Sequence, residues 1–500
     1  MKDSVNTLIL KSIGIDTYRE NIVYMHANCH ICLSEGFTAL TRVVVEFNNR
    51  HIVATLNVVH SDLLAPNEAG LSMEAQGRLN AHDGDILTIS HLKTIESLAL
   101  VRSKMYGSEL TEAGFRDIIT DVVEGHYSNI ELAAFISACS SDNLSVKEIT
   151  GLTKAMVHTG EILTWNEKMI FDKHCIGGLP GNRTSPIVIS IAAAAGLTIP
   201  KTSSRAITSP AGTADMMATI TKVDLNIARM KEVVAEQNAC LAWGGAVHLS
   251  PADDILISVE KALDVDSPGQ MIASVLSKKV AAGATHVVID IPVGPTAKVR
   301  SQEDALELAY YFKAVSGDLG IVTETVITDG SQPVGSGIGP ALEAMDVLAV
   351  LRNEPGAPAD LRDRSLKLAG ILLEMSGRCE QGKGAGKAAA ILSSGEAFEK
   401  FYKICMAQGG FTEPAMAHYR YDVLSSEEGV VQNINNRLLA RIAKLAGAPD
   451  TPSAGIRFHA PLGKKISRGD LLFTIFSGFA GQLEYAKDYL EGLNGLIELR

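Results

Sequence analysis

Apolar and polar residues alternate in the first part of the chain, as they do in half-buried strands. Alternating runs over residues 41–47 and 51–58 are separated by Asn48 and Asn49, which favour a turn. We therefore predict a β-rich N-terminal domain over residues 1–85.

From about residue 90 to 160 the apolar positions take helical spacing. Ser128 with Glu131 and Ser145 with Glu148 have the S-x-x-E spacing of a capping box, which marks the start of a helix. These signals predict a helical domain over residues 86–165, and residues 245–275, which have the same character, are expected to belong to it.

Short apolar runs separated by Gly-rich turns dominate the chain after residue 170. The runs at 187–195, 286–291 and 321–327 are interpreted as strands, and the helices between them predict a mostly parallel sheet. This gives an α/β domain over residues 166–244 plus 276–420. Strands return around turns at 462–463 and 468–470, which predicts a small α+β domain over 421–500. The fold class is therefore a multidomain α/β protein.

Composition narrows the classes of partner. The 500 residues are 46% hydrophobic with 44 glycines, which suits packed helix-on-sheet layers, and the formal charge of −12 argues against a general nucleic-acid binder. An anionic ligand would need a local site. The first ten residues lack the apolar core of a signal peptide and the run at 186–200 is too short to span a bilayer, so no membrane partner and a cytoplasmic location are expected.

Seven cysteines are spread along the chain, an odd number that fits reduced thiols better than a disulfide framework. Cys29 and Cys32 form a C-x-x-C pair, but no second pair completes a four-ligand zinc set. We interpret them as two half-buried thiols in a turn, and no metal is expected.

The densest chemical signal lies between an apolar strand and an apolar helix, at residues 173–185. Glycines there let backbone N–H groups approach an oxyanion, and the helix N-terminus adds partial positive charge. A tight turn that needs glycine is the structural alternative. Lys173, His174 and the hydroxyls of Thr184 and Ser185 favour a phosphate site.

A second loop, residues 202–215, carries six hydroxyl side chains and Arg205. Hydroxyls with a guanidinium suit an oxyanion or a sugar, whereas a solvated loop with helix caps is the alternative. Two such loops within some thirty residues favour the first interpretation.

These motifs resemble the thymidine and pyrimidine-nucleoside phosphorylases, in particular the longer branch that includes the archaeal AMP phosphorylases. The likeness covers nearly the whole chain and is most specific in K-H-x-x-G-G from Lys173, S-S-R-A-I-T-S-x-A-G-T-A-D from Ser203, and S-x-x-x-K-K from Ser274. It implies a helical and an α/β domain around an open cleft, an additional N-terminal domain, and a homo-oligomer.

The resemblance also implies roles for individual residues. Inorganic phosphate is a co-substrate, no organic cofactor is needed, and the substrate is a small nucleoside or nucleotide. The proton donor to the departing base matches Asp266, and His174 matches a histidine that contacts the base and helps to protonate it. The phosphate positions match Lys173, Ser203 and Thr213, with Thr184 and Ser185 nearby. The nucleoside or nucleotide positions match Gly178, Ser204, Arg205, Ala206, Ile207, Thr208, Ser209, Thr213, Ser274, Lys278 and Lys298.

Two positions depart from the short-form thymidine phosphorylases. Cys175 stands where they have serine, which replaces a good phosphate donor with a weak one. Their arginine that grips the pyrimidine, fifteen residues before the serine of S-x-x-x-K, falls on Val259.

Four functions stay open on the sequence. Phosphorolysis of thymidine or a related pyrimidine nucleoside leads, and phosphorolysis of AMP or another nucleoside 5′-monophosphate is its nearest rival. A phosphoribosyltransferase of the anthranilate type would need Mg²⁺ held by carboxylates such as Asp253 and Asp254, which also fit the first turn of a helix. A nucleotide-binding module without catalysis is the fourth.

Overall fold

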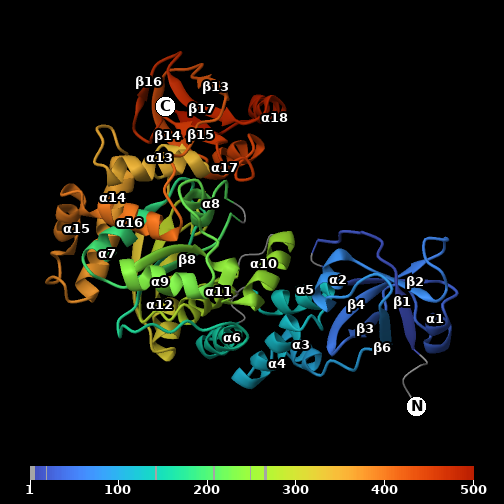
Figure 1. Cartoon of the computed structure of the whole chain (residues 1–500). Coiled ribbons are helices and arrows are strands. Elements are labelled where there is room, and N and C mark those ends of the chain that lie inside the picture. Colours follow the sequence, from blue (N-terminus) through green and yellow to red (C-terminus); the bar gives the residue numbers. More distant parts are fainter. Residues whose placement is uncertain (1–5, 19, 141–143, 207–208, 248, 264–266) are drawn as a thin grey trace. The chain divides into compact units, whose positions relative to one another are not determined.

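The computed structural model describes residues 6–18, 20–140, 144–206, 209–247, 249–263 and 267–500. The chain divides into two compact units: residues 1–110 with 117–138, and residues 111–116 with 139–500. Each is described by itself below and is drawn in Figure 1.

The first unit is built on a closed six-stranded barrel in the order β1-β5-β2-β4-β3-β6. Asn48 and Asn49, both at positive φ, connect β3 to β4 as the sequence predicts. The barrel continues through β6, past the expected domain end at residue 85, and the helices α3 to α5 follow it, although the first residues of α4 are assigned to the second unit. The elements are β1 (Thr7–Leu10), β2 (Ile22–His26), α1 (His30–Glu35), β3 (Arg42–Phe47), β4 (Arg50–Val59), β5 (Glu68–Leu71), α2 (Met73–Leu79), β6 (Ile86–His91), α3 (Ser97–Met105), α4 (Glu112–Val123) and α5 (Asn129–Ala138).

Five parallel strands form the centre of the second unit. β11, β10 and β7 make one sheet and β8 with β9 another, and a parallel bridge between Ile170 and Thr198 joins their edges. The predicted parallel sheet is therefore confirmed. These strands are β7 (Phe171–Cys175), β8 (Ile199–Ser203), β9 (Ala239–Trp243), β10 (His286–Val293) and β11 (Val322–Asp329).

Helices pack on this sheet and α6 packs on α10 and α11. Ser145 and Glu148 form the predicted capping box of α6. The helical elements are α6 (Val146–His158), α7 (Thr184–Ala194), α8 (Thr213–Ala218), α9 (Ile227–Gln237), the 3₁₀ turn η1 (Gly244–Val247), α10 (Pro251–Leu263), α11 (Pro268–Ala281), α12 (Gln302–Asp318), α13 (Pro340–Leu351), α14 (Ala359–Met375), α15 (Gly384–Ser393) and α16 (Glu396–Gln408).

The strand predicted over residues 187–195 is wrong, because this run lies in α7, the apolar helix that was also expected to follow the loop at 173–185. Every residue from Thr184 to Ala193 is buried, so no polar face reveals the helical period, and a buried helix cannot be told from a buried strand by periodicity. The alanines at its end favour a helix.

The C-terminal part of the second unit consists of short antiparallel strands with two helices. The strand pair β12 and β15 joins it to the α/β part, since β12 comes directly before α13. The elements are β12 (Gly337–Ile338), β13 (Tyr419–Leu424), β14 (Gly429–Ile434), α17 (Asn436–Leu445), β15 (Gly455–Phe458), β16 (Lys465–Ile466), β17 (Leu471–Ser477), α18 (Ala480–Glu491) and β18 (Ile497–Leu499).

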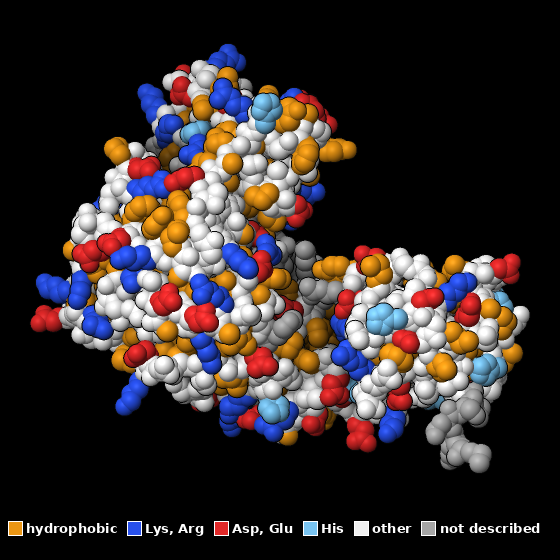
Figure 2. All heavy atoms as spheres, viewed as in Figure 1, with side chains coloured by type: hydrophobic (Ala, Val, Ile, Leu, Met, Phe, Trp, Pro, Cys, Tyr) orange, Lys and Arg blue, Asp and Glu red, His pale blue; other side chains and the backbone are white. Residues whose placement is uncertain are grey.

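Charged side chains of both signs are mixed over the face shown in Figure 2, where Lys and Arg stand among Asp and Glu. Among the described residues, no helix combines the length and the apolar character needed to cross a bilayer.

Candidate functional site

The parallel strands of the second unit end at the same edge of the sheet, and both predicted anion loops begin there. Residues 176–183 follow β7 and residues 204–212 follow β8. Ligands of open parallel sheets bind at this carboxyl edge, where loops and helix N-termini meet. The sequence signals therefore converge in space.

Lys173 lies on β7, the middle one of the five strands, two residues before the strand ends, and it is only 1% exposed. Its Nζ donates to Oγ1 of Thr184, 2.6 Å away, and Thr184 begins α7. Burial lowers the pKa of Lys173, and the nearby carboxylate of Asp290 opposes the shift. A buried ammonium beside a helix N-terminus provides the donors and the positive charge that an oxyanion requires.

Alternation along β7 sends Asp172 to the opposite face, where two buried lysines meet it. Lys279 Nζ on α11 lies 2.5 Å from Asp172 Oδ2, and Lys201 Nζ on β8 lies 3.2 Å from Oδ1. Burial would raise the pKa of Asp172, but the two lysines hold it below its ordinary value. Burial lowers the pKa of Lys279 to about 7 although Asp172 opposes the shift. The cluster of Asp172, Lys201 and Lys279 therefore holds two buried amines against a single carboxylate.

His174 follows on β7 and is surrounded by positive groups. Burial lowers its pKa well below the ordinary value, and Lys279, Lys201 and Lys278 lower it further. The imidazole is therefore neutral near pH 7 in the unliganded chain, which suits contact with a base better than donation of a proton.

Arg183 joins the two loops, and the sequence analysis gave it no role. Its Nη1 donates to Thr213 Oγ1 at 3.2 Å, its Nη2 to the carbonyl of Ala211 at 2.7 Å, and its Nε to the carboxylate of Glu343. Thr213 is thereby tied to the loop that follows β7, the strand that contains Lys173. The arginine stands one residue before Thr184, so its place in the loop was the available signal.

The second loop is held by Asp215 on α8. Its Oδ2 accepts the backbone N–H of Ala206 at 2.6 Å and of Gly212 at 2.9 Å. Arg205 Nη1 lies 3.4 Å from Asp215 Oδ1, and Arg205 Cζ lies 4.8 Å from the centre of the Trp243 ring. Ile207 and Thr208 lie outside the described residues.

Several predicted hydroxyls are engaged within the protein. Ser203 Oγ donates to the carbonyl of Ala242 at 3.3 Å, and Ser209 Oγ donates to that of Ala211 at 2.9 Å. Ser185 is buried at the start of α7 beside Thr184, and Ser204 is exposed directly after β8.

Gly178 and Lys298 lie side by side, since a Cβ added to Gly178 would stand 3.0 Å from Cβ of Lys298. Gly178 has φ +78°, so a side chain there would also be strained. Lys298 lines a hollow of about 260 Å³ together with Ser267, Gly269 and Tyr311. Asp266, the predicted proton donor, lies outside the described residues.

Ser274 and Lys278 occupy one face of α11. Lys278 Nζ lies 3.4 Å from Ser274 Oγ and 2.5 Å from Oδ2 of the buried Asp253. Asp253 is thus neutralised by a lysine, which leaves its carboxylate poorly placed to hold Mg²⁺.

Cys175 and Val259, the two positions that depart from the short-form thymidine phosphorylases, both lie in apolar or buried surroundings. Burial raises the pKa of the Cys175 thiol to about 12, and Asn182 Nδ2 donates to its Sγ at 3.2 Å. Val259 is buried on α10, where it offers no hydrogen bond to a base.

Cys29 and Cys32 are buried at the start of α1 instead of half-buried in a turn. Sγ of Cys29 caps the helix by accepting the N–H of Cys32 at 3.4 Å. Burial, reinforced by Cys29, raises the pKa of Cys32 to about 12, which is unlike a reactive thiol.

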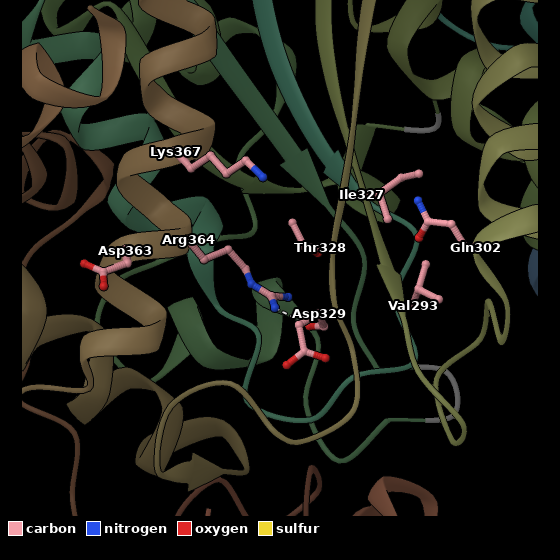
Figure 3. A pocket seen from close by; sticks show the side chains of 8 residues that line it. All are labelled: Val293, Gln302, Ile327, Thr328, Asp329, Asp363, Arg364 and Lys367. Carbon is pink, nitrogen blue, oxygen red and sulfur yellow. Dashed lines mark hydrogen bonds between the residues drawn. The ribbon is translucent and has the colours of Figure 1, made fainter. Parts of the chain in front are cut away.

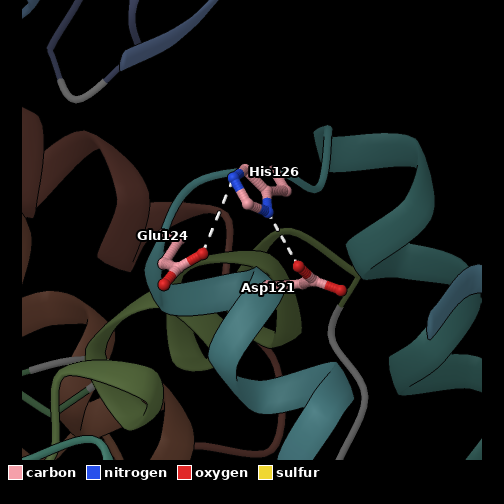
Figure 4. Close-up of side chains that lie close together, drawn as sticks. All are labelled: Asp121, Glu124 and His126. Atoms are coloured by element: carbon pink, nitrogen blue, oxygen red, sulfur yellow. Dashed lines mark hydrogen bonds and ion pairs between the residues drawn. The ribbon is translucent and has the colours of Figure 1, made fainter. Parts of the chain in front are cut away.

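One cluster of possible metal ligands occurs among the described residues, in the first unit (Figure 4). His126 directs Nδ1 to Asp121 Oδ1 at 2.7 Å and Nε2 to Glu124 Oε2 at 3.7 Å, and Ser97 donates to the other oxygen of Asp121. Because both ring nitrogens already face carboxylates, the cluster fits an ion-pair network.

Comparison with known proteins matches two segments of the chain to domain families. Residues 167–398 match the family described as "Glycosyl transferase family, a/b domain", and residues 98–160 match "Glycosyl transferase family, helical bundle domain".

Three relatives that match along nearly the whole chain share one name. A "Putative thymidine phosphorylase" from Hahella chejuensis is 54% identical over 97% of this chain and 96% of its own length. A protein of the same name from Legionella pneumophila (strain Corby) is 53% identical over 100% of this chain and 96% of its own length. Another from Ralstonia nicotianae is 54% identical over 96% of this chain and 95% of its own length.

Among solved structures, the anthranilate phosphoribosyltransferase from Thermus thermophilus is similar in fold. The TM-score is 0.53 at 21% identity, over 62% of this chain and 98% of that one.

Proposed function

Since the chain belongs to the glycosyl transferase family whose helical-bundle and a/b domains it carries, we propose that it is a pentosyltransferase that cleaves nucleosides with inorganic phosphate. The favoured substrate is thymidine or a related pyrimidine nucleoside, which yields the free base and pentose 1-phosphate. Relatives that match this chain over 96% of their own length carry the name of this activity.

The observation that carries the proposal is the pairing of buried Lys173 with Thr184 at the N-terminus of α7. A phosphate held there is positioned as the nucleophile, and positioning with electrostatic stabilisation supplies much of the catalysis in such a displacement. Arg183 would keep Thr213 against the same phosphate. Neither a metal nor an organic cofactor takes part.

The attacking oxygen of phosphate forms a bond to C1′ of the pentose while the bond from C1′ to the base nitrogen breaks. The electron pair of that bond leaves with the base, which needs a proton. We assign this proton to Asp266, and we assign contact with the base to the neutral His174.

The rival substrate is a nucleoside 5′-monophosphate such as AMP. Two observations favour it: Val259 is buried and apolar where a pyrimidine-gripping arginine would stand, and Lys298 lies against Gly178 where a second anionic group could be held. A phosphoribosyltransferase is less favoured, because the carboxylate of Asp253, which would have to hold Mg²⁺, is paired with Lys278.

The test is a substrate panel. The purified chain is incubated in phosphate with thymidine, uridine, adenosine, AMP and CMP, and free base is measured by chromatography. Release of thymine at the highest rate supports the favoured substrate, whereas faster release of adenine from AMP than from adenosine assigns the rival. Binding of these ligands without release of any base would reject catalysis.

A further inference from the structure

A hollow of about 520 Å³ lies where β10 and β11 end against α14 (Figure 3). Val293 and Asp329, the last residues of the two strands, form one side of it, and α14 forms the other. None of the roles assigned above uses these residues.

Two cations of α14 face this hollow. Arg364 and Lys367 are three positions apart and so lie on one side of the helix, and Figure 3 shows the Lys367 amine directed toward the strands. Arg364 is half-buried, and its Nη2 donates to the backbone carbonyl of Asp329.

The other terminal nitrogen of Arg364 is the feature that calls for a ligand. Within the described part of the chain, Nη1 is buried and has no hydrogen-bond partner. A buried charged donor without an acceptor is costly, and the planar guanidinium is shaped to bind carboxylate or phosphate oxygens.

The carboxylates of the lining do not meet this need. Asp329 Oδ1 accepts the backbone N–H of Ser331 at 2.9 Å and its hydroxyl at 2.6 Å. Asp363 points away from Arg364, to the far side of α14 (Figure 3).

The inner wall of the hollow is continuous with the strand that carries Lys173. Thr328 lines the hollow, and its Oγ1 donates to Oδ1 of buried Asp290 at 2.6 Å. Asp290 pairs with Cys175 across the sheet, two residues after Lys173. The charge of Arg364 also lowers the pKa of Lys173, after burial and the charge of Arg183.

We propose that this hollow is a second oxyanion site, in which Arg364 and Lys367 bind a phosphoryl group at the carboxyl ends of β10 and β11. Arg364 supplies Nη1 as a charge-assisted donor and Lys367 supplies its ammonium. The group comes from inorganic phosphate or from a sugar phosphate ester, which share this chemistry. The inference does not depend on catalysis by the chain.

The test measures phosphate binding by calorimetry on the full-length chain in a Lys173→Ala background, which impairs the first site. We expect this variant still to bind inorganic phosphate. Adding Arg364→Gln or Lys367→Gln should weaken that binding by about tenfold or more, as the loss of one charge-assisted bond implies. Arg364→Lys should weaken it less, since the charge is kept.

Arg362→Gln is the matched control, because it removes one positive charge from the exposed surface of the same helix. It should leave binding unchanged. Lys367 is exposed, so its variant should fold even where Arg364→Gln does not. A parallel titration uses ribose 5-phosphate. If inorganic phosphate binds more tightly, it is the source of the phosphoryl group, and if ribose 5-phosphate binds more tightly, the source is a sugar phosphate ester.

The proposal is overturned if Lys173→Ala binds neither ligand, or if Arg362→Gln weakens binding as much as the two lining variants. A failure of phosphorolysis in the substrate panel would leave this titration unaffected, so the two proposals fail separately.

Discussion

Among the residues of the site, Lys173 is the one best placed to bind an anion. Its ammonium is buried and donates to the hydroxyl of Thr184. The sequence indicated this residue through its glycine-rich loop. The place of Arg183 in the same loop was the one signal for this residue, but its role depends on contacts with Thr213 and Ala211, which the sequence does not show.

Lys173→Ala is expected to impair use of phosphate while leaving the fold intact. A charge-assisted hydrogen bond is worth about 1.5–3 kcal/mol, so the apparent efficiency with phosphate should fall about ten- to a hundredfold. Steady-state kinetics against phosphate measure this, with exposed Lys168→Ala as the matched control. Equal kinetics for both variants would remove Lys173 from the phosphate site.

Asp266→Asn and His174→Ala separate the proton donor from the base contact. Because the pKa of His174 lies below its ordinary 6.5, the ring is neutral at pH 7 and becomes charged only in more acidic solution. We expect Asp266→Asn to lower turnover by about 10²–10⁴-fold and to be rescued by a substrate whose base leaves without protonation. Rescue of His174→Ala instead would assign the donor role to His174.

At the scale of elements, Asp172 ties β7 to β8 and to α11 through Lys201 and Lys279. Asp172→Asn should destabilise the second unit by about 3–5 kcal/mol, because it leaves two buried amines without their carboxylate. Exposed Asp488→Asn is the control. Chemical denaturation followed by fluorescence measures the difference.

The pH dependence of this effect has a defined sign. The folded pKa of Asp172 lies below the ordinary 3.8, so its contribution is present above about pH 4 and is lost as the pH falls through the folded pKa. The gap between wild type and Asp172→Asn should therefore be largest at about pH 5, where Asp172 is ionised and Lys279, with its pKa of about 7, is still protonated, and it should narrow in acid. A gap that is constant over this range would contradict the ion-pair account.

Elements were predictable where local signals decide them. The Asn48-Asn49 turn, the capping box of α6 and the strands β10 and β11 follow from residues close in sequence. The helix α7 was mistaken for a strand because its burial on all sides hides its period. The end of the barrel at β6 could not be placed, since closure depends on pairing with β1 and β3.

At the scale of the whole molecule, the family resemblance predicts a homo-oligomer. Light scattering coupled to size-exclusion chromatography should give a mass of at least twice the 53.2 kDa of one chain. A single species at the mass of one chain would contradict this prediction.

The dependence of base release on inorganic phosphate tests the central claim most directly. The purified chain is incubated with thymidine, with and without phosphate and with a metal chelator, and thymine and sugar products are measured. The account predicts equimolar thymine and 2-deoxyribose 1-phosphate only when phosphate is present, at a rate that the chelator does not change. Equal release of thymine in phosphate-free buffer, with free sugar as the second product, would contradict it.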